Sequence, residues 1–236
     1  MRFFAISDLH LSFGTDKPMD VFGPHWDDHP SRLRRAWLDL VGHEDVVLVP
    51  GDISWAMRPA EAEADLSFLH GLPGTKVIIK GNHDYWWSTL GKLRQTLPGS
   101  IIPLQNSSVS FGDVTVAGSR LWIDPELSLE DVSEEDRRIF ARELGRLRLS
   151  LDSMQDGARV RIVMTHFPPL SLDGRPGKAV EAAAGREPDI WVFGHMHLGG
   201  ADYSGFTRTI GRTRFVFVSA DHLGFAPLLI LDSSNP

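Results

Sequence analysis

The chain has 236 residues, enough for one large α/β domain or two small ones with a substantial buried core. Its composition, 42% hydrophobic and 23% charged, is that of a soluble globular protein without low-complexity segments. The net charge of -7 argues against a broad electrostatic surface for nucleic acid or anionic membranes, and the absence of cysteine excludes disulfides and thiolate metal sites.

The start of the chain predicts a cytoplasmic protein. The apolar run that follows Met1 is too short for the hydrophobic segment of a secretory signal, and no apolar stretch of membrane-spanning length occurs further on. A chain without cysteine also fits a reducing compartment. No internal repeat or linker interrupts the sequence, so we expect a single domain over residues 1–236.

In the first hundred residues, predicted strands alternate with predicted helices. Strands are expected at 2–6, 46–49 and 77–79, and helices at 30–41, 59–69 and 90–97. This order implies parallel strands joined by right-handed crossovers, with ligands bound beyond the carboxyl ends of the strands. Residues 11–30 have no regular periodicity but are rich in aromatic side chains, which predicts an ordered loop insertion near such a site.

The remainder of the chain predicts further strands around one long helical insertion. The Gly112-Asp113 turn between two short apolar runs indicates a hairpin. Residues 128–156 predict a helical insertion, with Ser133 and Asp136 resembling a capping box at its start and an apolar stripe for core packing. A short alanine-rich helix is expected before residue 190, and further strands are expected at 160–164, 190–193, 206–210, 215–218 and 228–231. The chain therefore has an α/β pattern.

Five of the predicted strands end in residues that can bind a metal ion. One Asp or His after a strand is usually a cap or a turn residue. The recurrence at five strand ends is what indicates a site, because these ends are expected to meet at one rim. The seven side chains are Asp8, His10, Asp52, Asn82, His166, His195 and His197.

Seven ligands exceed what one tetrahedral ion can use, and they predict two divalent ions that share a carboxylate and a solvent oxygen. Asp52, alone after its strand, is the natural bridge. Four imidazoles beside carboxylates and an amide favour Mn, Fe or Zn over Ca or Mg. Two such ions about 3.5–4 Å apart clamp an in-line displacement at phosphorus and convert the bridging water into a hydroxide nucleophile.

The series of motifs resembles that of the calcineurin-like metallophosphoesterases, including bacterial members such as the UDP-diacylglucosamine hydrolases. It reads Asp8-x-His10, Gly51-Asp52, Gly81-Asn82-His83-Asp84, Thr165-His166 and Gly194-His195-x-His197. The resemblance implies a four-layer α/β/β/α sandwich of two mixed β-sheets with a dimetal site at the rim. It also implies one ion bound by Asp8, His10, Asp52 and His197, and a second bound by Asp52, Asn82, His166 and His195.

The same resemblance assigns catalytic roles to His83 and Asp84. His83 would contact the phosphate and protonate the leaving group, while Asp84 would hold its imidazole. Elementary chemistry agrees, because an imidazole next to a carboxylate can serve as an acid near neutral pH. Trp26, Trp55 and Trp86 lie next to the motifs and are candidates for stacking a flat or apolar leaving group; the alternative is that they pack the ligand loops in place.

These observations predict a dinuclear-metal phosphoesterase that hydrolyses a phosphomonoester or phosphodiester bond in a small, nucleotide-like substrate. A nuclease is the first alternative, which the acidic charge disfavours. A pyrophosphatase of a lipid-linked nucleotide sugar is the second, and the five arginines within 137–148 leave membrane contact open. A non-catalytic binding scaffold is the third, which the complete ligand set disfavours. Nucleic acid is not the expected partner, and the oligomeric state is not predicted.

Overall fold

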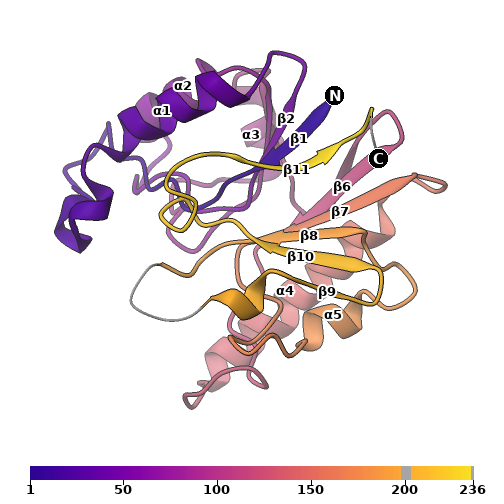
Figure 1. The fold of residues 1–236 in the computed structure, drawn as a ribbon. Coiled ribbons are helices and arrows are strands. Elements are labelled where there is room, and N and C mark those ends of the chain that lie inside the picture. Colours follow the sequence, from indigo (N-terminus) through magenta and orange to yellow (C-terminus); the bar gives the residue numbers. More distant parts are fainter. Residues whose placement is uncertain (198–202, 235–236) are drawn as a thin grey trace. The chain divides into compact units, whose positions relative to one another are not determined.

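The computed structural model describes residues 1–197 and 203–234, which fall into two compact units (Figure 1). Unit 1 comprises residues 1–103 and 218–236, and unit 2 comprises residues 104–217. Each unit contains one mixed β-sheet with helices beside it, so the predicted α/β class with two mixed β-sheets is confirmed. The expectation of a single domain over the whole chain stays a prediction.

The sheet of unit 1 has five strands in the order β11-β1-β2-β3-β4. The first four in sequence are parallel, of which the alternation of strands and helices predicted the first three, and β11 is added antiparallel at the edge beside β1. Their bounds are β1 Arg2–Ala5, β2 Val46–Val49, β3 Thr75–Ile78, β4 Ile101–Pro103 and β11 Leu228–Asp232. The carboxyl ends of β1, β2 and β3 therefore lie at one edge of this sheet.

Three helices cover unit 1: α1 His29–Leu40, α2 Glu63–His70 and α3 Leu90–Thr96. Leu33 and Trp37 of α1 are buried in the same core as Phe4 and Val47 of the sheet. The loop insertion is ordered, with two short 3-10 turns at Asp20–Phe22 and Pro24–Trp26.

The second helix begins at Glu63, four residues later than the sequence predicted. The side chain of Glu61 explains the delay. Its Oε2 accepts hydrogen bonds from the backbone nitrogens of Met57 (3.0 Å) and Arg58 (3.2 Å), which holds residues 59–62 in a turn. A local side-chain acceptor thus competes with helical hydrogen bonding.

The sheet of unit 2 has six strands in the order β5-β6-β7-β8-β10-β9. Four central strands are parallel, and an antiparallel strand closes each edge. The predicted hairpin at Gly112-Asp113 joins the first two strands, with Phe111 paired to Val114. The bounds are β5 Ser108–Phe111, β6 Val114–Ser119, β7 Val160–Thr165, β8 Ile190–Phe193, β9 Arg208–Ile210 and β10 Thr213–Phe217.

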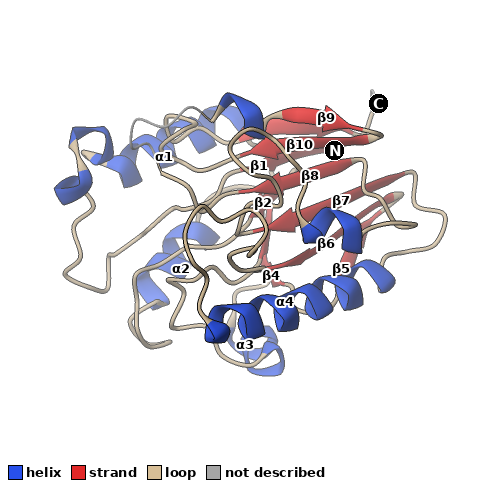
Figure 2. Ribbon diagram, turned by 90° about the horizontal axis from the view of Figure 1, so that it is seen from below, coloured by secondary structure: helices blue, strands red, loops and turns tan. Residues whose placement is uncertain are grey.

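Helix α4 Glu134–Asp152 lies along this second sheet (Figure 2), and α5 Lys178–Ala182 packs beside α4. The predicted cap is present, because Ser133 Oγ accepts a hydrogen bond from the Asp136 backbone nitrogen at 3.1 Å. Leu147 and Leu151 bury the apolar stripe of α4 in the core of unit 2. In the parts of the chain that the structure describes, neither α4 nor any other helix is long and apolar enough to cross a membrane.

The strand expected at 206–210 is shorter than predicted. Residues Ser204–Phe206 form a 3-10 turn, and only Arg208–Ile210 pair in the sheet as β9. The reason is the side chain of Phe206, which is buried among Phe193 and Phe217 and draws the backbone out of the strand.

Candidate metal centre

The segment that follows β1 and the segment that follows β2 run side by side, which brings two predicted ligand motifs of unit 1 together. The backbone nitrogen of Asp8 donates to Gly51 O at 3.1 Å, and that of His10 donates to Asp52 O at 3.0 Å. Leu11 and Ser54 form an isolated parallel bridge one step further. The parallel pairing of the strands is thus extended into the loops that carry the ligands.

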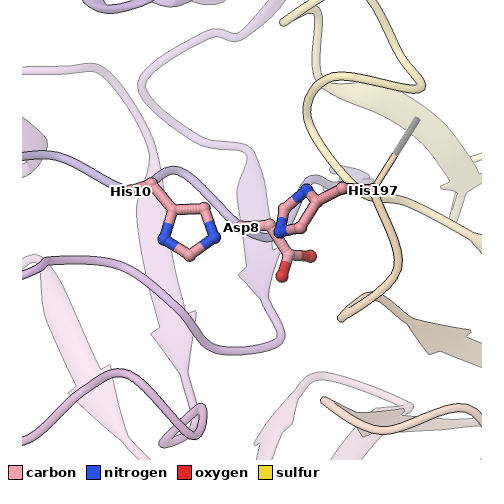
Figure 3. A group of neighbouring side chains, drawn as sticks. All are labelled: Asp8, His10 and His197. Atoms are coloured by element: carbon pink, nitrogen blue, oxygen red, sulfur yellow. The ribbon is translucent and has the colours of Figure 1, made fainter. Parts of the chain in front are cut away.

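Three predicted ligands of unit 1 lie pairwise close to one another. Ligand atoms of Asp8 and His10 lie within 4.8 Å of each other, and so do those of Asp8 and Asp52. His10 Nε2 is 3.8 Å from Asp52 Oδ2. All three residues are at most 1% exposed, and Figure 3 shows Asp8 and His10 leaving the same stretch of chain after β1.

The backbone at these ligands is left-handed. The φ angles are 57° at Asp8, 45° at His10 and 51° at Asp52. This conformation is unfavourable for residues with a side chain and is found where function and surrounding structure impose it. Among the described residues eight non-glycine positions have positive φ, and four of them, including His195 at 74°, are predicted ligands. The strain is concentrated at the predicted site.

Two serine hydroxyls orient the carboxylate of Asp8. Ser7 Oγ donates to Asp8 Oδ2, and Ser219 Oγ donates to the same oxygen at 2.9 Å. Ser219 was not identified from the sequence, because it lies 211 positions away and no motif marks it. Its only sequence signal is its position directly after an apolar run that resembles the other strand ends.

Gly81 allows the loop after β3 to approach Asp52 closely. A Cβ atom at Gly81 would overlap Oδ1 and the backbone nitrogen of Asp52. The same Asp52 Oδ1 accepts a hydrogen bond from the His83 backbone nitrogen at 2.8 Å. Asn82 lies between these two contacts in the sequence, so the loop that carries it is held directly against the predicted bridging carboxylate.

The buried carboxylate of Asp84 joins two ligand loops. Its Oδ1 accepts from the backbone nitrogens of Ile53 (2.9 Å) and Ser54 (3.2 Å) and from Trp86 Nε1 (2.9 Å), and its Oδ2 accepts from Gly81 N (2.7 Å). A carboxylate has about four acceptor positions. These four donors, none of which is the His83 imidazole, assign Asp84 a part in holding the loops of Asp52 and Asn82 together.

The environment of Asp84 also changes its acidity. Burial raises the pKa of Asp84 to about 6, and the nearby charge of Asp52 acts in the same direction. The hydrogen bonds from Gly81, Ser54 and Trp86 oppose the rise. Burying this carboxylate costs free energy, which fits its role of holding the two ligand loops together.

The three tryptophans predicted as substrate contacts differ in their surroundings. Trp26 and Trp86 are each 2% exposed and belong to the core of unit 1, which favours the packing alternative for both. Trp55 is partly buried, and its ring lies 4.8 Å from that of His10 and 4.4 Å from that of His83. Trp55 is therefore the one of the three that is placed between a predicted ligand and the predicted acid.

Unit 2 carries the other three histidines that were predicted as ligands, and they lie at the ends of neighbouring parallel strands. His166 follows β7, while His195 and His197 (the latter labelled in Figure 3) follow β8. His195 Nδ1 is 3.3 Å from His166 Nε2, and the Phe167 ring lies 3.9 Å from that of His195. Tyr203 Oη donates to the backbone oxygen of His197 at 2.6 Å. The first two imidazoles can thus serve one ion.

The donor sets of both units suit divalent metal ions. In unit 1 the carboxylates of Asp8 and Asp52 are buried within 4.8 Å of each other, so their repulsion is unfavourable without a cation. In unit 2 two imidazole nitrogens face each other at a separation that a metal ion can bridge.

Comparison with known protein families agrees with this chemistry. The family model for calcineurin-like phosphoesterases matches residues 1–199, a stretch that contains every predicted ligand. The chain belongs to this family. The calcineurin-like match ends just past His197, so β9, β10 and β11 lie beyond the matched stretch.

Two curated phage proteins are similar to part of this calcineurin-like chain. The gene 66 protein of Mycobacterium phage D29 is 42% identical over 79 residues, which are 33% of this chain and 38% of that protein. The gene 66 protein of Mycobacterium phage L5 is 35% identical over 80 residues, 33% of this chain and 37% of that protein. The chain thus spans well under half the length of the curated relatives that it matches.

Two solved structures share the calcineurin-like fold of this chain over nearly its full length. The phosphopantetheinyl hydrolase PptH of Mycobacterium tuberculosis has a TM-score of 0.61 at 15% identity, covering 100% of this chain and 98% of its own. The protein of unknown function AQ665 of Aquifex aeolicus has a TM-score of 0.54 at 14% identity, covering 96% and 94%. At such identities these structures support the fold alone.

Proposed function

We propose that this chain is a phosphoesterase that depends on two divalent metal ions and hydrolyses a monoester or diester of a small substrate. The observation that carries the proposal is the buried cluster of Asp8, His10 and Asp52 at adjoining strand ends, in a member of the calcineurin-like family. Strained backbone at all three residues supports a functional role over a structural one.

The proposed ligands are divided between the two ions as the family resemblance implies. Asp8, His10, Asp52 and His197 hold the first ion, and Asp52, Asn82, His166 and His195 hold the second. When bound, such a pair of ions supplies Lewis acidity toward phosphoryl oxygens and a nucleophilic water. The residues of the chain supply the remaining functions, which are orientation, charge and proton transfer.

His83 is the proposed acid that protonates the leaving oxygen. Its backbone nitrogen is anchored to Asp52 Oδ1, and its ring packs 4.4 Å from Trp55 and 5.7 Å from His10. The ring contacts hold the imidazole of His83 next to the proposed ligand His10. The hydrogen bond to Asp52 fixes the backbone of His83. Asp84 supports this arrangement by holding the loops of Asp52 and Asn82 together. Of the three tryptophans, Trp55 is the one that we propose for contact with the leaving group.

A substrate panel tests the proposal. We would assay p-nitrophenyl phosphate, its bis-ester, cyclic nucleotides, nucleoside diphosphates and phosphopantetheine, each with Mn, Fe or Zn and after chelation. The expected result is hydrolysis that needs added metal and favours one ester class, which also identifies the substrate type. Absence of metal-dependent hydrolysis across the panel would contradict the proposal and favour a binding scaffold.

A further inference from the structure

Unit 2 contains a cavity of about 540 Å³ that reaches one of the proposed metal ligands. It is formed by residues 122–130 after β6, residues 167–175 after β7, and the segment around His195 and Phe206. Its size is in the range of cavities that bind small organic molecules. The cavity is therefore much larger than a phosphate group alone requires.

The walls of the cavity are mainly apolar. The apolar side chains that line it include Trp122, Leu127, Phe167, Leu170, Met196 and Phe206. Three more apolar residues of the lining are exposed to solvent: Leu129 is 95% exposed, and Ile123 and Leu172 are each 39% exposed. Exposed apolar side chains around an apolar cavity are typical of a ligand-binding surface.

The polar groups in the lining are largely used to hold the surrounding loops. Asp124 accepts hydrogen bonds from the backbone nitrogens of Glu126 (3.0 Å) and Lys178 (2.8 Å). Ser171 Oγ donates to Asp173, and Arg175 Nη2 donates to Glu126 O at 3.3 Å. These groups stabilise the loops, so the chemistry that remains for recognising a ligand is apolar contact.

His195 connects the cavity to the proposed chemistry. This residue belongs to the lining, its Nδ1 faces His166 Nε2 at 3.3 Å, and Phe167 of the same wall packs on its ring. A phosphate bound at these histidines would place a substituent of the ester at the mouth of the cavity. We infer that the cavity binds an apolar alkyl or aryl group of the phosphoester substrate; this inference rests on the proposed function.

Calorimetry with non-hydrolysable phosphonates tests the inference without turnover. The protein, in buffer with Mn, is titrated with methylphosphonate, octylphosphonate and 1-naphthylmethylphosphonate. We expect the octyl or the naphthyl compound to bind at least about tenfold more tightly than methylphosphonate, since burial of a large apolar group contributes that much or more. A gain for the octyl compound alone identifies an alkyl group, and one for the naphthyl compound alone identifies an aryl group.

A double variant locates the gain in the cavity. Ile123→Gln with Leu172→Gln makes the edge polar at similar side-chain size and without added charge, at positions that are already partly exposed. Leu149→Gln is the matched control, because Leu149 is 55% exposed on α4 of the same unit and does not line the cavity. The double variant should lose most of the tenfold gain, with methylphosphonate affinity unchanged, while the control should keep it.

The outcomes separate the cavity from the catalytic proposal. Equal affinity for all three phosphonates, no binding of any, or an undiminished gain in the double variant would each overturn the inference. Hydrolysis of p-nitrophenyl phosphate together with equal phosphonate affinities overturns the cavity proposal alone. A gain that depends on Ile123 and Leu172, without hydrolysis of any ester in the panel, overturns the proposed function alone.

Discussion

Side-chain chemistry and backbone strain coincide at the proposed ligands. Asp8, His10, Asp52 and His195 have positive φ angles, a conformation that costs about 1–3 kcal/mol at each residue and that the surrounding interactions must offset. A chain selected for stability alone would favour glycine at such positions, because glycine adopts this conformation without steric cost. The retained Asp and His side chains therefore indicate that their ligand atoms, and not the turn itself, are what these positions provide.

Replacement of His83 separates acid catalysis from metal binding. We expect His83→Ala to lower turnover by about 10²–10⁴, because a positioned general acid contributes that factor, while metal content stays the same. Turnover is measured on p-nitrophenyl phosphate and metal by elemental analysis. His43→Ala, an exposed histidine of unit 1, is the control and should change neither quantity. Loss of metal together with activity would make His83 a ligand.

Gly81 is a second residue whose role is specific. A Cβ atom there would overlap the backbone nitrogen and Oδ1 of Asp52, neither of which can move without disturbing the ligand loop. We expect Gly81→Ala to lower the free energy of unfolding by about 1–3 kcal/mol and to weaken metal binding. Gly145→Ala in α4, where no atom lies within 4 Å, should instead raise stability by about 0.5–1 kcal/mol. Denaturant unfolding of both variants measures this contrast, and equal effects would contradict it.

At the scale of the elements, the sequence predicts a helix or strand boundary correctly where a side chain with a known local role, such as a capping residue, sets it. Ser133 caps α4 as predicted, because a serine hydroxyl at that position satisfies a backbone nitrogen of the first turn. The start of α2 and the start of β9 were wrong by a few residues. In both cases a side chain, Glu61 or Phe206, acts on the backbone in a way that periodicity does not indicate.

Strand β3 contains a buried lysine that makes stability depend on pH. Lys76 is fully buried, its Nζ donates to Leu72 O (2.7 Å) and Gly74 O (2.8 Å), and burial lowers its pKa to about 8 from 10.5. Between these values the unfolded chain binds more protons than the folded one, so stability contributed at this site rises with pH. Below pH 8 both states are protonated and the penalty of burying the charge is constant.

We therefore expect the unfolding free energy of the wild type, relative to Lys76→Met, to increase between pH 8 and 10.5. The increase should be on the order of 2 kcal/mol once residual solvation of the ammonium is allowed for. Denaturant titrations at several pH values measure it. Lys92→Met, on the exposed side of α3, controls for the loss of one positive charge. A difference that stays constant from pH 7 to 11 would contradict the assignment.

At the scale of the whole molecule, the predicted ligands come from segments that are far apart in the sequence. Unit 1 carries Asp8, His10, Asp52 and Asn82, and unit 2 carries three histidines. Because these ligands are distant in sequence, the unfolded chain does not present them together. Metal binding should therefore be linked to folding.

Removal of metal should lower the stability of the folded protein. An ion present at 100 times its dissociation constant stabilises the native state by about 2.7 kcal/mol, so chelation should lower the melting temperature and Mn should restore it. Asp52→Asn should lower the number of bound ions and reduce the recovery on adding Mn. Calorimetry with elemental analysis measures both effects. Two tightly bound ions in this variant would remove Asp52 from the bridging role.

The sequence by itself determined the order of strands and helices and the motifs at the strand ends, because both depend on residues close together along the chain. It could not reveal that Ser219 orients Asp8, that Asp84 joins the loops of Asp52 and Asn82, or that Trp26 and Trp86 are core residues. Nor could it reveal the apolar cavity beside His195, whose walls come from segments up to about eighty residues apart. These features depend on contacts between distant segments, and only the tertiary structure brings those segments together.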